Sequence, residues 1–378
     1  MNIKLVTRMQ SPGPKKILAM DGGGIRGMMT VEVLAELENL LRKKLGGGDD
    51  FVLADFFDFV SGTSTGAIIA ACVSLGMKVD DIREFYISSG KEMFDKASFL
   101  KRFRYKFEDE KLADKMKEVF GKDTSLGSDK LKTVLMMVMR NATTDSPWPL
   151  SNNPLAKYNR VERTVEPYND CNLDFPLWQL VRASTAAPVY FPPEVITMGT
   201  NSFVFVDGGI TTYNNPAFQA FIMATVEPYK MNWSTGEDKM LVVSIGTGTS
   251  PQANKNLSPD DMNLFYNAGS VPSALMYSAL NEQDMLCRVF GNCLVGDELD
   301  REVGDLIGST GPVAPSKLFT YLRYNAELTD SGLTALGLTG INPEEVQKLD
   351  SVENIGELQQ IGKAVAKKVK PEHFAAFL

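Results

Sequence analysis

The sequence predicts an α/β fold with a mainly parallel central sheet flanked by helices. Two apolar runs in the first 75 residues each end near glycine and are followed by a helical pattern, the alternation typical of parallel strands. Two later apolar runs also end at glycine-containing turns. With 44% hydrophobic and 23% charged residues, the 378-residue chain has ample material for a large packed core.

The first predicted strand is KKILAMD, which ends at Asp21 and leads into the glycines of GGGIRG. A helix is predicted next, because apolar residues recur at three- and four-residue steps up to the glycine run 46–48. These residues are Met28, Val31, Leu34, Leu37, Leu41 and Leu45. FFDFVSG is predicted as the second strand, and the stretch from Thr65 to Leu75 as the second helix.

Two further strands are predicted at FVFVD, which ends at Asp207, and at MLVVSIG, which ends at Gly246. From Pro251 onward the pattern becomes mainly helical and shows no internal repeat. We expect this segment to pack on the same core as the strands before it.

Composition excludes several classes of protein. The chain has 39 Lys plus Arg against 47 Asp plus Glu, so no basic face is expected to bind nucleic acid. The four cysteines lack C-x-x-C spacing and are too few for a disulfide framework, which predicts reduced thiols. The sequence has neither a signal-peptide pattern nor the run of about 18 apolar residues that a spanning helix needs. A soluble, cytoplasmic protein is expected.

Gly62-Thr63-Ser64-Thr65-Gly66 fits the G-x-S-x-G pattern of a nucleophile elbow. In such an elbow, small residues permit a tight turn from strand to helix that exposes the serine oxygen. A turn of small residues without any catalytic role is the alternative. The predicted strand before the motif and the predicted helix after it favour the elbow.

GGGIRG also fits G-x-G-x-x-G, the dinucleotide-binding pattern, through Gly22, Gly24 and Gly27. That pattern expects an acidic residue about 20 positions later at the end of a second strand. Here Asp49 and Asp50 follow a glycine run instead of an apolar strand. Successive glycine N–H groups at a helix start also suit the oxyanion of an acyl-transfer reaction, and a simple tight turn is the remaining alternative.

A nucleophilic serine needs a base, and the only histidine is His373, close to the C-terminus. A desolvated aspartate within hydrogen-bonding reach of the hydroxyl is able to replace histidine. Asp207 is the best candidate, because it ends a predicted strand just before two glycines, and carboxyl ends of parallel strands are where sites assemble. An aspartate before Gly-Gly is also a common turn former.

Taken together, these stretches resemble a known family. DGGGIRG, GTSTG and VDGG occur in the order and context found in patatin-like phospholipases. ASTAAPVYFPP, NNP and SIGTG extend the match, which runs from about Ile17 to Gly248. The resemblance implies a patatin-like catalytic domain over residues 14–250, followed by the mostly helical segment 251–378.

The resemblance also implies a Ser-Asp dyad without histidine, with Ser64 as nucleophile and Asp207 as general base. Gly22, Gly23 and Gly24 would present the amides of the oxyanion hole, and Arg26 would help to hold their loop. All of these residues stand at the positions of the family's motifs.

The function implied is hydrolysis of fatty-acyl esters of phospholipids or glycolipids, by a calcium-independent phospholipase that meets the membrane surface peripherally. No cofactor or metal is expected, since the sequence has no calcium-loop motif. Acyl transfer to an acceptor other than water, and a catalytically silent module that binds lipid or nucleotide, are the alternatives. FLKRFRYKF, residues 99–107, suggests a basic-aromatic patch for anionic membranes, or a solvated charged face.

Overall fold

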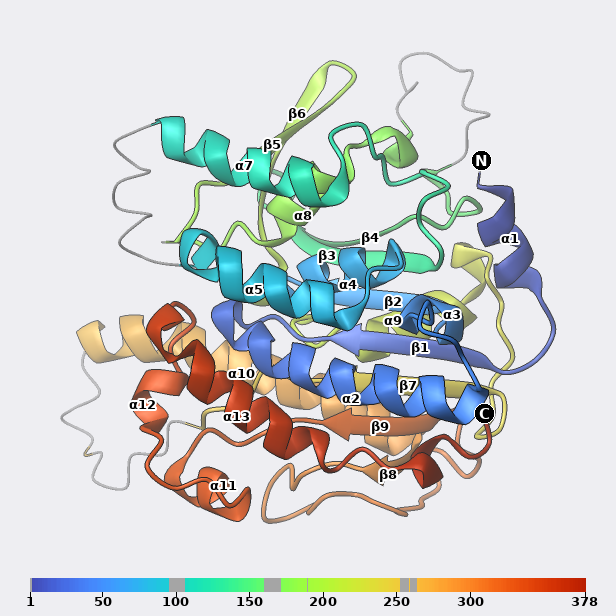
Figure 1. The fold of residues 1–378 in the computed structure, drawn as a ribbon, viewed down its shortest axis with the longest axis vertical. Coiled ribbons are helices and arrows are strands. Elements are labelled where there is room, and N and C mark those ends of the chain that lie inside the picture. The colour runs from blue at the N-terminus through green and yellow to red at the C-terminus, as the bar shows by residue number, and fades with distance from the viewer. Residues whose placement is uncertain (1, 95–105, 160–170, 189, 252–257, 259–263) are drawn as a thin grey trace.

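The computed structural model describes residues 2–94, 106–159, 171–188, 190–251, 258 and 264–378 (Figure 1). Nine strands in this part of the chain form one mixed sheet. They are β1 Lys15–Met20, β2 Phe59–Thr63, β3 Val134–Asn141, β4 Ser146–Ser151, β5 Glu194–Met198, β6 Asn201–Asp207, β7 Met240–Ile245, β8 Asn292–Val295 and β9 Thr320–Tyr324. Hydrogen-bonded pairing runs in the order β5-β6-β3-β2-β1-β7-β9-β8, and β4 also pairs with β3.

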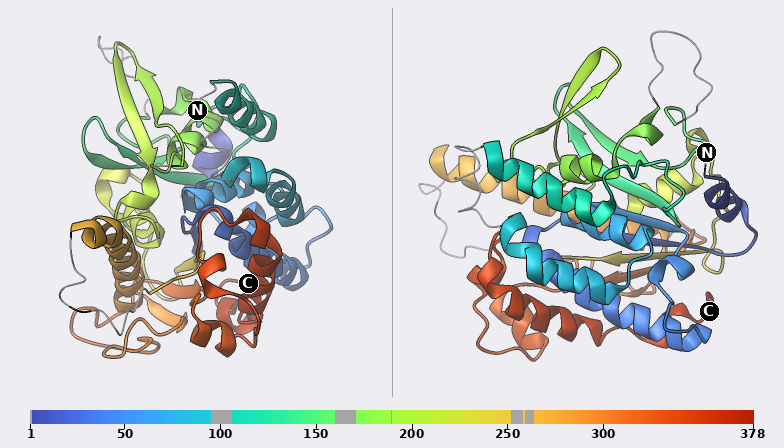
Figure 2. Two further views of the ribbon diagram at one scale, coloured as in Figure 1. Left: turned by 90° about the vertical axis from the view of Figure 1, so that its left-hand side faces the viewer. Right: turned by 45° about the horizontal axis from the view of Figure 1, so that its top comes forward.

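Helices cover both faces of this sheet (Figure 2). They are α1 Ile3–Gln10, α2 Gly27–Leu45, α3 Leu53–Phe56, α4 Thr65–Ser74, α5 Val79–Phe94, α7 Lys106–Phe120, α8 Leu177–Ser184, α9 Ala217–Thr225, α10 Leu264–Phe290, α11 Asp330–Ala335, α12 Pro343–Val346 and α13 Ile355–Ala366. Successive residues of β1 alternate between two cores, as strand geometry requires. Leu18 and Met20 pack with α2, α4 and α13, whereas Ile17 and Ala19 pack with α1 and α9.

The predicted α/β class is confirmed. β1 pairs in parallel with β2 and β7, and β2 pairs in parallel with β3. α2 ends where predicted, because Gly46 adopts the left-handed conformation, with φ +66°, that closes many helices. The start of the second strand differs from the prediction: FFDFVSG begins at Phe56, the last residue of α3, whereas β2 begins at Phe59. The Asp55 carboxylate stabilises the N-terminal end of α3 by accepting from the Val52 N–H at 2.9 Å.

The segment after residue 250 contributes strands as well as helices. Its described part holds α10 to α13, but also β8 and β9, which the sequence pattern does not predict. β9 pairs in parallel with β7, so the sheet continues across residue 250. The domain boundary at that position stays a prediction.

β3 brings the ends of β2 and β6 together. Its Val138 pairs with Thr63 of β2, and its next residue, Met139, pairs with Asp207 of β6. Both partners use the same edge of β3, because β4 pairs along the other edge over residues 136–141. β6 runs antiparallel to β3, in contrast to the parallel arrangement expected for the strand before Asp207. β2 and β6 therefore meet head to head, with Ser64 and Asp207 at the junction.

Among the helices that the structure describes, none combines the length and the hydropathy needed to span a membrane.

Candidate active site

Ser64 occupies a sharp turn between β2 and α4. Its backbone has φ 55° and ψ −123°, outside the regions that most side chains favour, as in a strained nucleophile elbow. The turn is possible because Gly62 has no side chain: a Cβ atom there would lie 2.0 Å from the Gly66 carbonyl oxygen. The residues of the predicted motif thus form the predicted turn.

Ser64 and Asp207 are directly hydrogen-bonded. The Ser64 hydroxyl donates to Oδ2 of Asp207 at 2.6 Å, and the Gly209 N–H donates to Oδ1 at 2.6 Å. Only 4% of Asp207 is exposed. Burial raises the pKa of this carboxyl to about 6, although both hydrogen bonds favour the ionised form. A carboxylate with this pKa is able to accept a proton near neutral pH.

His373 belongs to a different part of the structure. Its Nδ1 lies 2.8 Å from the Tyr324 hydroxyl, and its ring is half-buried. Burial lowers the pKa of His373. Among the described residues, the hydrogen bonds of the Ser64 side chain and N–H go to Asp207 and Ser184, and none goes to His373.

Ser184, at the end of α8, holds the backbone of the elbow. Its hydroxyl accepts from the Ser64 N–H at 3.0 Å and donates to the Val138 carbonyl at 2.5 Å. One buried side chain therefore connects the turn to β3. Sequence reasoning gave Ser184 no role, and its only signal was its place in the ASTAAPVYFPP block.

Replacing Ser184 with alanine is expected to lower the kcat for a soluble ester by roughly 10-fold to 100-fold, because a buried N–H left without an acceptor costs about 1–3 kcal/mol. Ser61→Ala is the matched control, since Ser61 is a buried serine of β2 whose hydroxyl donates to the Leu18 carbonyl. Steady-state kinetics and thermal unfolding of both variants make the comparison. Equal losses of kcat in the two variants would contradict a specific role for Ser184.

The glycine loop after β1 lies against the elbow. The Gly22 N–H donates to the Asn214 carbonyl at 3.1 Å, and the Gly22 carbonyl accepts from the Thr247 hydroxyl at 2.7 Å. Within the described residues, the N–H groups of Gly23 and Gly24 donate to no protein acceptor. Of the three predicted oxyanion donors, Gly22 is therefore already engaged, while Gly23 and Gly24 keep their N–H groups available.

The loop has no room for side chains. A Cβ atom at Gly23 would lie 2.1 Å from the Thr247 hydroxyl oxygen, and one at Gly24 would lie 2.2 Å from the Leu349 carbonyl oxygen. Gly24 also has φ +58°, a backbone conformation that strains other residues. These close approaches explain the run of consecutive glycines.

Arg26 lies at the end of the same loop, directly before α2. Its Nε donates to the Gly23 carbonyl at 3.4 Å, and its Nη1 donates to the Gln347 carbonyl at 3.3 Å. Burial lowers the pKa of Arg26 to about 10, against the opposing effect of Asp21. The side chain therefore links the loop to the segment that precedes α13.

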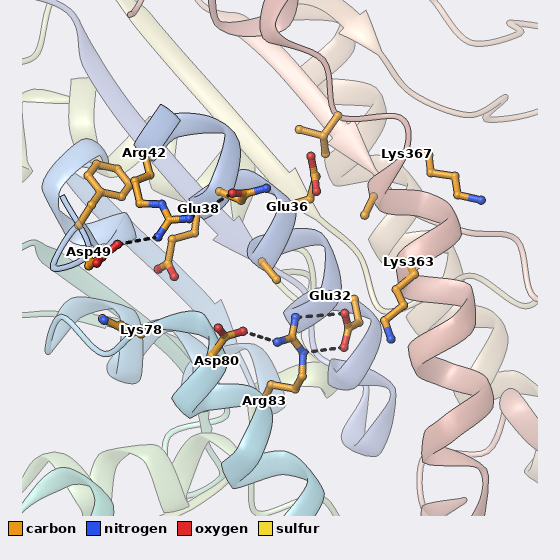
Figure 3. A pocket seen from close by; sticks show the side chains of 15 residues that line it. Glu32, Glu36, Glu38, Arg42, Asp49, Lys78, Asp80, Arg83, Lys363 and Lys367 are labelled. Atoms are coloured by element: carbon orange, nitrogen blue, oxygen red, sulfur yellow. Dashed lines mark hydrogen bonds and ion pairs between the residues drawn. The ribbon is translucent and has the colours of Figure 1, made fainter. Parts of the chain in front are cut away.

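A groove of about 660 Å³ between α2, α5 and α13 is a separate feature (Figure 3). Its lining is mostly charged, and Arg83 forms ion pairs there with Glu32 and Asp80. None of the predicted site residues lines it. This charged groove does not fit an acyl chain.

Two other predictions concern metal binding and membrane contact. Over the described ranges, no three His, Cys, Asp or Glu side chains gather in a way that would hold a metal ion. Residues 99–105 of the basic-aromatic stretch lie outside the described residues, and the side chains of Lys106 and Phe107 are not described either. The membrane-docking role of this stretch stays a prediction.

Comparison with known proteins gives a consistent family assignment. A sequence model for patatin-like phospholipases matches residues 18–221, more than half of the chain. Patatin-T5 from Solanum tuberosum is 27% identical over 320 residues, which cover 75% of this chain and 78% of that protein. Patatin-17 from Solanum cardiophyllum is 28% identical over 259 residues, which cover 63% of this chain and 62% of that protein. The chain therefore spans less than two thirds of the length of Patatin-17.

Among solved structures, the crystal structure of VipD from Legionella pneumophila aligns over 93% of this chain and 67% of that chain. The TM-score is 0.34 and the sequence identity is 12%. This likeness is too distant to support a conclusion about the site.

Proposed function

Because the chain belongs to the patatin-like phospholipase family, we propose that it is a lipid acyl hydrolase that works through a Ser64–Asp207 dyad. The observation that carries the proposal is the 2.6 Å hydrogen bond from the Ser64 hydroxyl to Asp207 at the junction of β2 and β6. The substrates proposed are fatty-acyl esters of phospholipids or glycolipids. The proposed dyad and glycine loop lie within residues 14–250, the proposed catalytic domain, and the strands and helices after residue 250 complete its sheet and core. The protein is proposed to act in the cytoplasm at the surface of a membrane.

The reaction begins when the Ser64 hydroxyl attacks the ester carbonyl and Asp207 accepts its proton. The N–H groups of Gly23 and Gly24 stabilise the oxyanion, while Gly22 shapes the loop through its bonds to Asn214 and Thr247. Collapse of the tetrahedral intermediate expels the alcohol, which takes the proton from Asp207. An acyl-enzyme remains on Ser64.

Water then attacks the acyl-enzyme while Asp207 again accepts a proton, and the fatty acid leaves as Ser64 recovers its hydrogen. None of these steps calls for a metal ion or a cofactor. An alcohol leaves more readily than an amine, so a dyad without an imidazole acid suits esters better than peptides.

The pH dependence of the reaction is expected to follow Asp207. Because its pKa is raised to about 6, the base is protonated at lower pH, and kcat/KM should fall about tenfold for each unit of pH below that value. The measurement is a pH–rate profile on a soluble ester, with His373→Ala as control. The acidic limb should persist unchanged in that variant, and its disappearance would assign the titration to His373.

Labelling with a fluorophosphonate tests the proposed nucleophile. Mass spectrometry is expected to place the label on Ser64 in the wild type, and Asp207→Asn is expected to slow labelling strongly. A catalytically silent binding module would leave Ser64 unlabelled. Product analysis with added alcohols separates hydrolysis from acyl transfer, since a transferase would form new esters in preference to free fatty acid.

A further inference from the structure

Arg323 of β9 joins the C-terminal segment to the glycine loop. Its Nη1 donates to Oδ1 of Asp21 at 2.9 Å, and its Nη2 donates to Oδ2 at 2.6 Å. Asp21 immediately precedes Gly22, and both charged side chains are only 1% exposed. Arg323 lies outside the region matched by the family model, which ends at residue 221.

The same guanidinium is fixed by other groups. Nη1 also donates to the Ser244 hydroxyl of β7 at 2.7 Å. Nε lies 3.8 Å from Oδ2 of Asp284, which in turn binds Arg288 through two hydrogen bonds of 2.9 and 2.7 Å. Asp21, Arg323, Asp284 and Arg288 thus follow one another as alternating negative and positive charges. Each buried charge lies next to one of opposite sign.

We infer that Arg323 is a positioning residue for the glycine loop, residues 22–24. It acts through Asp21 on the N–H groups of Gly23 and Gly24, the proposed oxyanion donors. A guanidinium that holds both oxygens of a carboxylate fixes its plane as well as its position. Asp21 is thereby held where β1 ends and the loop begins. This role rests on the proposed function, because it concerns the oxyanion that the dyad would generate.

Other contacts from the C-terminal segment hold the far side of the loop. The Leu349 carbonyl accepts from the Ile25 N–H at 2.9 Å and lies against Gly24. The Gln347 carbonyl accepts from Arg26. Residues after 320 therefore brace the loop at both of its ends, and Arg323 supplies the charged contact.

Arg323→Lys tests this role, with Arg288→Lys as the matched control. Lysine keeps the positive charge but offers a single nitrogen, which is unable to hold both Asp21 oxygens in one plane. Arg288 is equally buried and equally bidentate, but its carboxylate partner is Asp284 and it does not contact the loop. We expect Arg323→Lys to lower kcat about 100-fold with little change in KM, the effect of losing one oxyanion donor. Arg288→Lys leaves the Arg323–Asp21 pair in place and should keep kcat within about threefold of the wild type.

Hydrogen exchange provides a readout that does not depend on activity. The amides of Gly22 and Ile25, which donate to the Asn214 and Leu349 carbonyls on either side of Gly23 and Gly24, are expected to exchange about tenfold faster in Arg323→Lys than in the wild type, and close to the wild-type rate in Arg288→Lys. Ser244→Ala, a smaller change that removes one acceptor from the same guanidinium, should shift kcat in the same direction by about 3-fold to 10-fold.

Equal effects of Arg323→Lys and Arg288→Lys on kcat and exchange would overturn the inference, since both would then act only through stability. If Arg323→Lys does not fold, the Ser244→Ala result decides, and an unchanged kcat and exchange rate in that variant overturn the inference. A wild-type protein without esterase activity would reject the proposed function, while the exchange rates would still test the positioning role.

Discussion

Replacing Ser64 with alanine, or Asp207 with asparagine, is expected to lower the turnover of a soluble ester by about 10⁴-fold or more. Ser64→Ala removes the attacking oxygen, and Asp207→Asn replaces the carboxylate that accepts from the Ser64 hydroxyl with an amide, which is unable to take up its proton. Residues that act as a unit give losses that do not multiply. The double variant should therefore be no slower than the slower single variant.

The free energy of unfolding of Asp207→Asn shows whether this variant loses activity because it unfolds or because it lacks the proposed base. The folded-state pKa of Asp207, about 6, lies above the ordinary value of 3.8, so the folded protein binds this proton more tightly than the unfolded chain. The contribution of Asp207 to the free energy of unfolding is therefore fully present below about pH 3.8 and is lost as pH rises through about 6. Asparagine does not ionise, so Asp207→Asn should be more stable than the wild type at about pH 8, by up to about 3 kcal/mol.

Urea unfolding at about pH 8 and about pH 4 measures this difference, which should shrink at the lower pH because the wild-type carboxyl is then protonated. Single-variant losses of activity that multiply in the double variant would contradict a dyad. A pH-independent stability difference would contradict the buried, raised-pKa carboxyl.

Replacing Gly24 with alanine is expected to lower kcat by at least about 100-fold, the scale of removing one oxyanion donor. The new Cβ atom would meet the Leu349 carbonyl oxygen at 2.2 Å, and φ at this position is +58°. Because the obstacle is backbone and not a flexible side chain, the loop must move, and the N–H of Gly24 moves with it.

Gly46→Ala is the matched control for backbone strain. Gly46 has φ +66°, but a Cβ atom there meets nothing within 4 Å. It should therefore cost about 1 kcal/mol of stability, as for other left-handed positions, and leave kcat unchanged. Steady-state kinetics and thermal unfolding of both variants provide the comparison. If Gly24→Ala retains the wild-type kcat, the loop does not bind the oxyanion.

The sequence predicted those elements whose signals are local. β1, α2, β2 and α4 follow from apolar runs, helical spacing and glycine stops that lie within a few residues of each element. The Ser64 turn also follows from its immediate neighbours. The antiparallel direction of the strand before Asp207 could not be predicted in this way. It depends on the pairing of β6 with β3, and no pattern within FVFVD indicates that pairing.

β9 was missed for a related reason. TYLRY places an arginine in the middle of a short run, which argues against a buried strand when only the neighbouring residues are considered. The charge is acceptable because Asp21 neutralises it from 302 positions away in the chain. Ser184 is similar, since its hydroxyl gains a role only when α8 packs against the Ser64 turn, 120 positions away.

Because the carboxyl ends of β2 and β6 meet at β3, Ser64 and Asp207 come together only after the chain has been synthesised through β6. Ser64 leaves the ribosome 143 residues ahead of Asp207, and Asp21 leaves 302 residues ahead of Arg323. Closing loops of this length costs chain entropy before any contact compensates for it, so these pairings form late in folding. Under the proposed mechanism, a nascent or truncated chain exposes Ser64 without its proposed base, and esterase activity would report that the sheet has formed from β6 to β9.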